Sequence, residues 1–479
     1  MQIPAKGISE HDVMAQLKAF GAEDLDTRGG GTWAYAYDSG RGDVDRAAKA
    51  AYSMFLDANG LDPTVFPSLL ELENRLTAMA ATHLGGGPEV VGNFTSGGTE
   101  SILLAVKTAR DYYRDRHPAG GRPRMILPAT AHAAFHKAAH YLDVDKVLVP
   151  VDPVSFTVDP DAVKAAITPD TMLLVGSAVS YAHGVTDPIA ALGELALAHD
   201  TLLHVDGCIG AFLLPYFHRL GAAVTPFDFS VPGVTSISMD WHKYAYCPKG
   251  ASVVLYRDKS IRKHQIFACA DWPGYTIVNT ALQSSKSGGP LAAAWAVLNL
   301  IGEDGFLKIA RRTLEATRRI VSAVDGMAAL RVLGRPEASL VACASDSVDV
   351  FEVVDEMKTR GWYVQPQLSY PGSPANIHLS IDGASLNRVD DMLADLSQAA
   401  DAAKRVLPEG RDELADFAAA LRPDELSSES VAEMMAAVGI RNGRLPVRMA
   451  PINRLLDAMS IPVRERLLTE FFNDIFIYR

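Results

Sequence analysis

The chain has 479 residues, of which 48% are hydrophobic and 21% charged, which is ordinary for a globular protein with one large domain and one or two smaller ones. Its formal net charge of −12 argues against a nucleic-acid partner or an anionic membrane surface, because both select basic proteins. The four cysteines lack the spacing of a zinc site or a disulfide framework, and no apolar run suits a signal peptide or a membrane anchor, so we expect a cytoplasmic protein.

Residues 1–80 are predicted to form an N-terminal arm that begins with a short helix. A loop rich in glycine and aromatic residues follows, from Arg28 to Tyr37. Such a loop is either a lid near a ligand or a plain surface loop. The sequence alone favours the surface loop.

Residues 81–330 alternate short apolar runs with helical patterns such as residues 188–199. The pattern predicts an α/β fold with a mostly parallel, doubly wound sheet, in which ligands bind beyond the carboxyl ends of the strands. The predicted strands are residues 125–127, 146–150, 172–176, 201–206, 235–239 and 251–256.

Residues 331–479 are predicted to form a smaller C-terminal α+β domain. Its predicted strands are residues 345–350, 362–365 and 377–381, and its predicted helices lie around residues 386–407 and 463–476.

Three motifs of the large domain carry chemistry. The loop Thr95-Ser-Gly-Gly-Thr-Glu-Ser101 opens a helix, and the unpaired N–H groups and dipole at a helix N-terminus suit a phosphate. Asp206 ends one apolar run, and Lys243 follows another after His242. A phosphate cradle, an acid and a lysine are the parts that hold pyridoxal phosphate (PLP). The lysine forms a Schiff base with the aldehyde, and the acid keeps the pyridine nitrogen protonated.

Each motif also has a plain structural interpretation. A glycine pair before a helix is common, Asp206 alone suits a helix N-cap, and an isolated lysine usually lies at the surface. The combination favours a PLP enzyme. We expect burial among aromatic residues and nearby cations to lower the pKa of Lys243.

Further side chains complete the predicted site. His132 is the best candidate to stack on the pyridine ring, although alone it suits an ordinary helix start. His242 is a donor for the phosphate, and Lys249 supplies a second cation. The turn formed by residues 284–289 precedes another helix and is a second candidate for binding an anion.

With these residues in place, the chain resembles the group II PLP-dependent decarboxylase superfamily, of fold type I, and within it the sphingosine-1-phosphate lyase family. The resemblance extends from about Gly30 into the C-terminal helices. The context of the lysine, Asp240-Trp-His-Lys-Tyr-Ala-Tyr-Cys-Pro-Lys-Gly250, resembles the lyases rather than the amino-acid decarboxylases. The matching motifs are residues 95–104, 131–141, 183–188, 204–212 and 235–250.

The resemblance implies a role for each candidate residue. The chain would form a homodimer with shared active sites, in which Ser285 reaches the phosphate of the second subunit. Tyr35 or Tyr37 and the segment around Asp62 would meet the substrate. In the cofactor site, Lys243 would carry PLP, Asp206 would bind the pyridine nitrogen, His132 would stack on the ring, and Gly98, Thr99 and His242 would bind the phosphate.

The chain departs from the family's pattern at two positions that bear on the substrate. Asp62 stands where the family has a histidine, and the family's Gly-Ser-Arg-Pro-Gly-Gly reads Ser-Ser-Lys286-Ser-Gly-Gly here. An acid repels a phosphoryl group. The predicted partner is therefore a small-molecule amine, with or without a phosphate.

The reaction that the resemblance implies is retro-aldol cleavage of the Cα–Cβ bond of a 2-amino-3-hydroxy substrate, giving an aldehyde and an amine. The freed Lys243, a tyrosine such as Tyr37, or Lys249 would serve as the base. The alternative is an amino-acid decarboxylase that releases CO2 from the same cofactor site. A silent scaffold with this fold is the third hypothesis, and the presence of Lys243, Asp206 and His132 argues against it.

Overall fold

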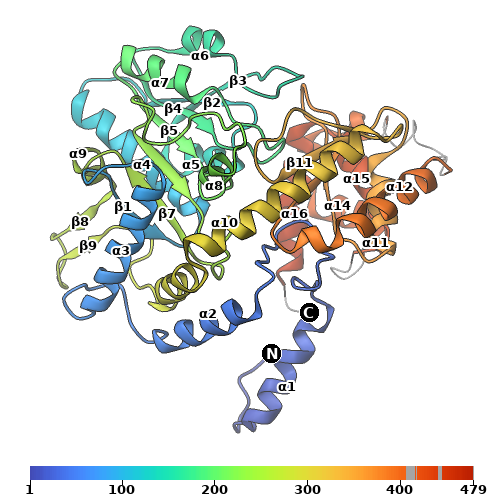
Figure 1. The fold of residues 1–479 in the computed structure, drawn as a ribbon, viewed down its shortest axis with the longest axis horizontal. Helices are drawn as coiled ribbons and strands as arrows, with labels where there is room; N and C mark the ends of the chain where they lie inside the picture. Colours follow the sequence, from blue (N-terminus) through green and yellow to red (C-terminus); the bar gives the residue numbers. More distant parts are fainter. Residues whose placement is uncertain (406–415, 417, 438, 441–444, 478–479) are drawn as a thin grey trace.

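The computed structural model of the protein describes residues 1–405, 416, 418–437, 439–440 and 445–477. Two sheets lie at either end of the long helix α10 (Gly289–Asp325), as Figure 1 shows. The first half of α10 packs in the core of the large sheet and the second half in the core of the small one. The helix bends at Gly302, whose φ of 64° is not helical. One helix therefore connects the two parts.

The large sheet has seven strands, and only β7 runs antiparallel to its neighbours. The order across the sheet is β1 (Val91–Thr95), β7 (Ser252–Tyr256), β6 (Ser236–Met239), β5 (Leu202–Asp206), β4 (Thr171–Ser177), β2 (Arg124–Pro128) and β3 (Asp145–Val149). The six strands predicted from the sequence are confirmed to within one residue at each end.

Successive residues of a strand point to opposite sides of the sheet, so a strand with apolar residues throughout makes both faces apolar. Helices cover both faces of this sheet. Met125 and Leu127 lie in one core and Ile126 in the other. The predicted doubly wound α/β fold is confirmed. The helices of this part are α2 (Gly42–Met54), α3 (Pro67–His83), α4 (Gly98–Arg116), α5 (Ala133–Leu142), α6 (Pro160–Ala166), α7 (Ile189–Ala198), α8 (Leu214–Arg219) and α9 (Lys259–Arg262), and a separate hairpin pairs β8 (Phe267–Cys269) with β9 (Ile277–Asn279).

The small sheet is antiparallel. Its order is β10 (Arg331–Val332), β11 (Leu340–Ala344), β13 (Asn376–Ser380) and β12 (Gln365–Gln367), and its helices are α11 (Val350–Thr359) and α12 (Val389–Ala403). The predicted strand at residues 345–350 is wrong. The Asp349 side chain accepts a hydrogen bond from Phe351 N and caps α11, so the valines around it begin a helix. Residues 406–407 of the predicted last helix lie outside the described residues.

The described C-terminal residues form a separate small core. They include α14 (Ser428–Ala437), α15 (Ala450–Ala458) and α16 (Ile461–Ile475), which confirms the helix predicted at residues 463–476. At the other end of the chain, α1 (Glu10–Phe20) has no buried residue and extends away from the body in Figure 1. The domain boundaries at residues 80 and 330 stay a prediction. Among the described helices, none has the length and apolar character to cross a membrane.

The prediction of a plain surface loop at residues 28–37 is wrong. The Trp33 side chain is 1% exposed and packs edge to face on Trp362 in the core of the small sheet. Trp33 N donates to Tyr363 O, and Ser380 N donates to Trp33 O. This segment therefore adds to the small domain before the chain enters the large one.

Candidate active site

Two predicted site residues lie on neighbouring strands at the carboxyl edge of the large sheet. Asp206 is the last residue of β5, and Lys243 follows the end of β6 by four residues. The two strands pair in parallel, with Asp206 opposite Ser238. The acid and the lysine therefore leave the sheet at the same edge, where the fold predicts a ligand.

Asp206 is buried and held by its surroundings. Its Oδ1 accepts hydrogen bonds from Cys208 N at 3.1 Å and from the Ser238 hydroxyl at 3.4 Å. It is not a helix cap, because α8 starts only at Leu214 and has no side-chain cap. The alternative interpretation of Asp206 as a helix N-cap is therefore wrong.

The expectation of a lowered pKa for Lys243 is also wrong. Its Nζ lies 2.8 Å from Oδ2 of Asp240, a carboxylate that the sequence analysis did not assign. Burial disfavours the charged amine and is the largest single effect, but the charge and hydrogen bond of Asp240, together with Cys208 and Tyr37, outweigh it and raise the pKa of Lys243. An acid three residues before the lysine, at the end of a strand, was the available sequence signal.

The glycine-rich loop is fixed by Glu100. One carboxylate oxygen accepts from Ser96 N at 2.6 Å, and the other accepts from Leu282 N at 2.7 Å. Gly98 begins α4, and a Cβ added there would lie 2.8 Å from Cys208 Sγ and 2.9 Å from Asp240 Oδ2. Thr99 is exposed at the next position of the helix. Position 98 of this loop therefore has room only for glycine.

Of the two candidate histidines, His242 lies beside the glycine-rich loop, and His132 lies at the start of α5, after the carboxyl end of β2. His242 accepts from Ala251 N through Nδ1, and its Nε2 lies 3.7 Å from Asp240 Oδ2. A Cβ at Gly97 would lie 3.5 Å from its ring. His132 is the N-cap of α5 and accepts from Ala134 N, which agrees with the helix-start interpretation. The ring of His132 stays exposed and can still stack on a ligand.

The N-terminal segment brings Tyr37 to the lysine turn. The Lys249 Nζ lies 4.7 Å from the centre of the Tyr37 ring and donates to Tyr35 O. Burial, with the charge of Lys243, lowers the pKa of Lys249 to about 8. Burial raises the pKa of Tyr37 to about 12. Lys249 therefore titrates close to neutral pH, and Tyr37 stays protonated.

Tyr181 is a further residue that the sequence analysis did not assign. Its ring meets that of His132 edge to face at 6.4 Å and stacks on His378 at 4.5 Å. Its hydroxyl donates to Gln365 Oε1 at 2.6 Å. Because His378 and Gln365 belong to the small sheet, only the fold shows that this tyrosine lies beside His132.

Ser285 and Asp62 lie in loops away from these contacts. Ser285 is exposed in the loop between β9 and α10, where the next residue, Lys286, forms an ion pair with Glu73. Asp62 accepts from the backbone and hydroxyl of Thr64 and closes a turn. Neither side chain forms a described hydrogen bond with Lys243 or Asp206, so both assignments stay predictions.

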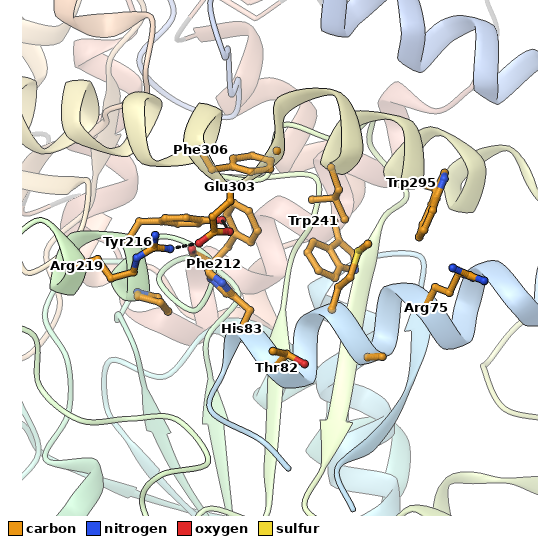
Figure 2. A pocket seen from close by; sticks show the side chains of 15 residues that line it. Arg75, Thr82, His83, Phe212, Tyr216, Arg219, Trp241, Trp295, Glu303 and Phe306 are labelled. Carbon is orange, nitrogen blue, oxygen red and sulfur yellow. Dashed lines mark hydrogen bonds and ion pairs between the residues drawn. The ribbon is translucent and has the colours of Figure 1, made fainter. Parts of the chain in front are cut away.

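A cavity of about 830 Å³ borders the other side of the lysine turn. Figure 2 shows α10 along one side of it and α3 along the other, with Trp241 between them. Arg219 forms an ion pair with Glu303 at one end of the cavity. Lys243, Asp206 and His132 do not line this cavity, so it is distinct from the candidate cofactor site.

The model of the pyridoxal-dependent decarboxylase conserved domain matches residues 52–343, which include Gly98, His132, Asp206 and Lys243. The chain belongs to this family. A second family model, for a C-terminal domain of pyridoxal-dependent enzymes that carries the label HTH, matches residues 412–474. The cofactor predicted from the three motifs is thus confirmed at the level of the family.

Its relatives include sphingosine-1-phosphate lyases. The enzyme from Oryza sativa is 40% identical over 84% of this chain and 75% of its own length, and that from Dictyostelium discoideum is 38% identical over 82% and 73%. A solved sphingosine-1-phosphate lyase from Burkholderia pseudomallei superposes with a TM-score of 0.80 at 36% identity, over 84% of this chain and 93% of that one. A glutamate decarboxylase from Lactobacillus brevis, with a TM-score of 0.75 at 19% identity over 85% of this chain and 96% of that one, shows the same fold.

The residues of this chain fit PLP. The Gly98 cradle admits no side chain, and Asp240 Oδ1 is buried without a hydrogen bond of normal geometry to the described residues. Lys243 is the primary amine at this edge, and Asp206 is the acid on the neighbouring strand. Among the described residues, histidine, cysteine, aspartate and glutamate side chains form no group of three or more that could hold a metal ion.

We expect Gly98→Ala to weaken PLP binding by at least about tenfold, because its Cβ collides with Cys208 and Asp240. Titration of the cofactor-free protein with PLP, followed by absorbance, measures this. Gly97→Ala is the matched control, since its Cβ makes only an ordinary contact with His242 and its φ of 163° is open to any residue. Equal affinities of the two variants would contradict the cradle.

Proposed function

We propose that this protein is a PLP-dependent carbon–carbon lyase that cleaves the Cα–Cβ bond of a 2-amino-3-hydroxy substrate to an aldehyde and an amine. The observation that carries the proposal is the similarity to sphingosine-1-phosphate lyases over four fifths of the chain. The chemical arrangement of Lys243, Asp206, Tyr37 and Lys249 supports it, because it supplies an attachment point, an acid and two further groups for proton transfer.

PLP, when bound, supplies an electron sink for the bond that breaks at Cα. Asp206 would hold the proton at the ring nitrogen, and the first turn of α4 with His242 would bind the phosphate. His132 would cover the ring. Lys249 is the base for the substrate hydroxyl, because a group with a pKa of about 8 both accepts and releases protons near neutral pH. Tyr37, with its raised pKa, positions Lys249 through its ring.

We also propose that the substrate amine carries a phosphate, as the name sphingosine-1-phosphate lyase indicates for the relatives. Asp62 opposes this electrostatically if it lies near the substrate. In this chain Asp62 is committed to the turn at Thr64, which lowers its pKa and keeps it ionised. The phosphate must therefore bind to cations elsewhere in the site.

The proposed reaction is tested by mass spectrometry of the products from phosphorylated and free β-hydroxy amines and β-hydroxy amino acids. We expect an aldehyde and an amine from a phosphorylated β-hydroxy amine, and no product from Lys243→Ala. Release of CO2 from amino acids, with no aldehyde, would establish the alternative of a decarboxylase. A wild-type protein that attaches PLP and turns over nothing would support the silent scaffold.

The proposed role of Lys249 predicts a pH-dependent kcat. Since the base must be neutral, kcat should rise with pH through about 8. Lys249→Arg keeps the charge at every pH and should lower kcat by about 100-fold or more and remove this limb, with KM nearly unchanged. Steady-state kinetics of both proteins from about pH 6.5 to 9.5 measures this. A Lys249→Arg variant that keeps kcat would assign Lys249 to binding rather than proton transfer.

We further propose the homodimer with shared active sites. The exposed β8–β9 hairpin supports it, because Phe267, Trp272, Tyr275 and Val278 present apolar surface beside the loop that carries Ser285. A second copy that covers this surface would receive Ser285 at its own phosphate site.

Mixed dimers test this arrangement. Lys243→Ala and Ser285→Glu, each inactive alone, are unfolded together in denaturant and refolded as a mixture. Half of the dimers then contain both chains, and one of their two sites is intact, so about a quarter of wild-type activity should return. Independent sites in each chain would restore none.

The HTH label of the C-terminal unit does not change the prediction that nucleic acid is not a partner. Four of its described arginines bind groups of this chain: Arg448 and Arg454 pair with Glu352, Arg464 donates to Leu456 O, and Arg466 pairs with Glu470. Cations held in this way offer little to a phosphate backbone, whose binding depends on free lysines and arginines. We propose that this unit instead stabilises the small domain through α11.

A further inference from the structure

Asp240 occupies an unusual position for an acid. Its side chain is 1% exposed, and its Oδ2 lies 2.8 Å from Lys243 Nζ and 3.7 Å from His242 Nε2. Its Oδ1 makes no hydrogen bond of normal geometry with the described residues. A buried carboxylate is costly unless a cation compensates it. The charge of Lys243 is therefore the main stabilising partner of Asp240.

The same carboxylate lies directly against the phosphate cradle. A Cβ at Gly98 would come within 2.9 Å of one Asp240 oxygen and 3.0 Å of the other. The absence of a side chain at Gly98 thus lets Asp240 reach the first turn of α4, where the helix dipole favours a negative charge. Asp240 lies between the amine that would carry the cofactor and the loop that would bind its phosphate.

The groups around Lys243 come from three parts of the chain. Asp240 and Lys249 belong to its own turn, with His242 between them; Cys208 follows β5, and Tyr37 comes from the N-terminal segment. Burial by itself favours the neutral amine. Asp240 supplies the largest opposing contribution, through its charge and its hydrogen bond, and together with Cys208 and Tyr37 it shifts the balance to the ammonium form.

We propose that Asp240 is a positioning residue that holds the Lys243 amine at the cofactor site in its charged form and accepts its proton when the amine reacts. This inference rests on the proposed attachment of the cofactor to Lys243. One proton passes from Nζ to the carboxylate, and the neutral amine adds to the aldehyde carbon. The two remaining amine hydrogens leave with the aldehyde oxygen as water when the carbon–nitrogen double bond forms. The proton stays on Asp240, which has lost its cation and is more stable neutral.

Labelling of the cofactor-free protein tests the proposal without any turnover. Wild type and Asp240→Asn are treated with an amine-acylating reagent from about pH 7.5 to 10.5, and mass spectrometry quantifies the peptide that carries Lys243. Because the pKa of Lys243 in wild type is raised above the ordinary lysine value, its labelling stays slow over this range, and we expect the labelling curve of Asp240→Asn to lie at least about one pH unit lower. Labelling near pH 8.5 then rises about tenfold.

Asp258→Asn is the matched control. It removes the same charge from the cap of α9, which follows β7 at the opposite edge of the sheet, and asparagine caps a helix equally well. Its labelling profile should match wild type. Asp240→Ser gives the same readout should Asp240→Asn fail to fold. A folded Asp240 variant that is labelled at the wild-type rate across this pH range overturns the proposal.

Reduction of the wild-type complex with borohydride separates this inference from the proposed function. Addition of the reduced cofactor at Lys243 confirms the attachment point whatever the labelling shows. Addition at another lysine overturns the proposed function, while a shifted labelling curve would still establish the pairing of Asp240 with Lys243.

Discussion

The parallel pairing of β5 with β6 is the constraint on which the site depends. It places Asp206 opposite Ser238, so that the acid at the end of one strand and the turn from Asp240 to Lys243 at the end of the next share one edge. Parallel strands need long crossover connections, and here the crossover includes α8. The acid and the lysine are therefore far apart in the sequence although they lie close together in space.

Much of this arrangement follows from local patterns. Six of the seven strands of the large sheet were predictable to one residue at each end, because strands such as β5 and β7 are buried and mostly apolar runs bounded by loops. β1, Val-Gly-Asn-Phe-Thr, lacks such a run and was not predicted. The small sheet was harder, because Asp349 converts a stretch rich in valine into the start of a helix. The helix start depends on the single capping side chain of Asp349, whereas the valines around it favour a strand, so the sequence pattern predicted a strand.

The errors in the site share a physical cause. The pKa of Lys243 depends on whether one nearby carboxylate points at its amine, and the sequence gives the position of Asp240 but not the direction of its side chain. Tyr181 is placed by Gln365 and His378, almost two hundred residues later, through contacts that no local pattern encodes. The motif around His183 proves to be structural: Gly184 packs on Leu340 O, where a Cβ would lie 2.2 Å away, and buried Asp187 accepts from Ser177 N.

The burial of Trp33 has a consequence for how the protein is made. Its indole completes a core whose other members lie between residues 316 and 450, so the start of the chain must wait for that sequence to leave the ribosome. The seven-stranded sheet, complete by residue 256, has no such delay. Because domains fold as units during synthesis, the large domain can form first, with the N-terminal segment still loose. Tyr37 would then reach Lys249 only when the last strands of the small sheet have assembled.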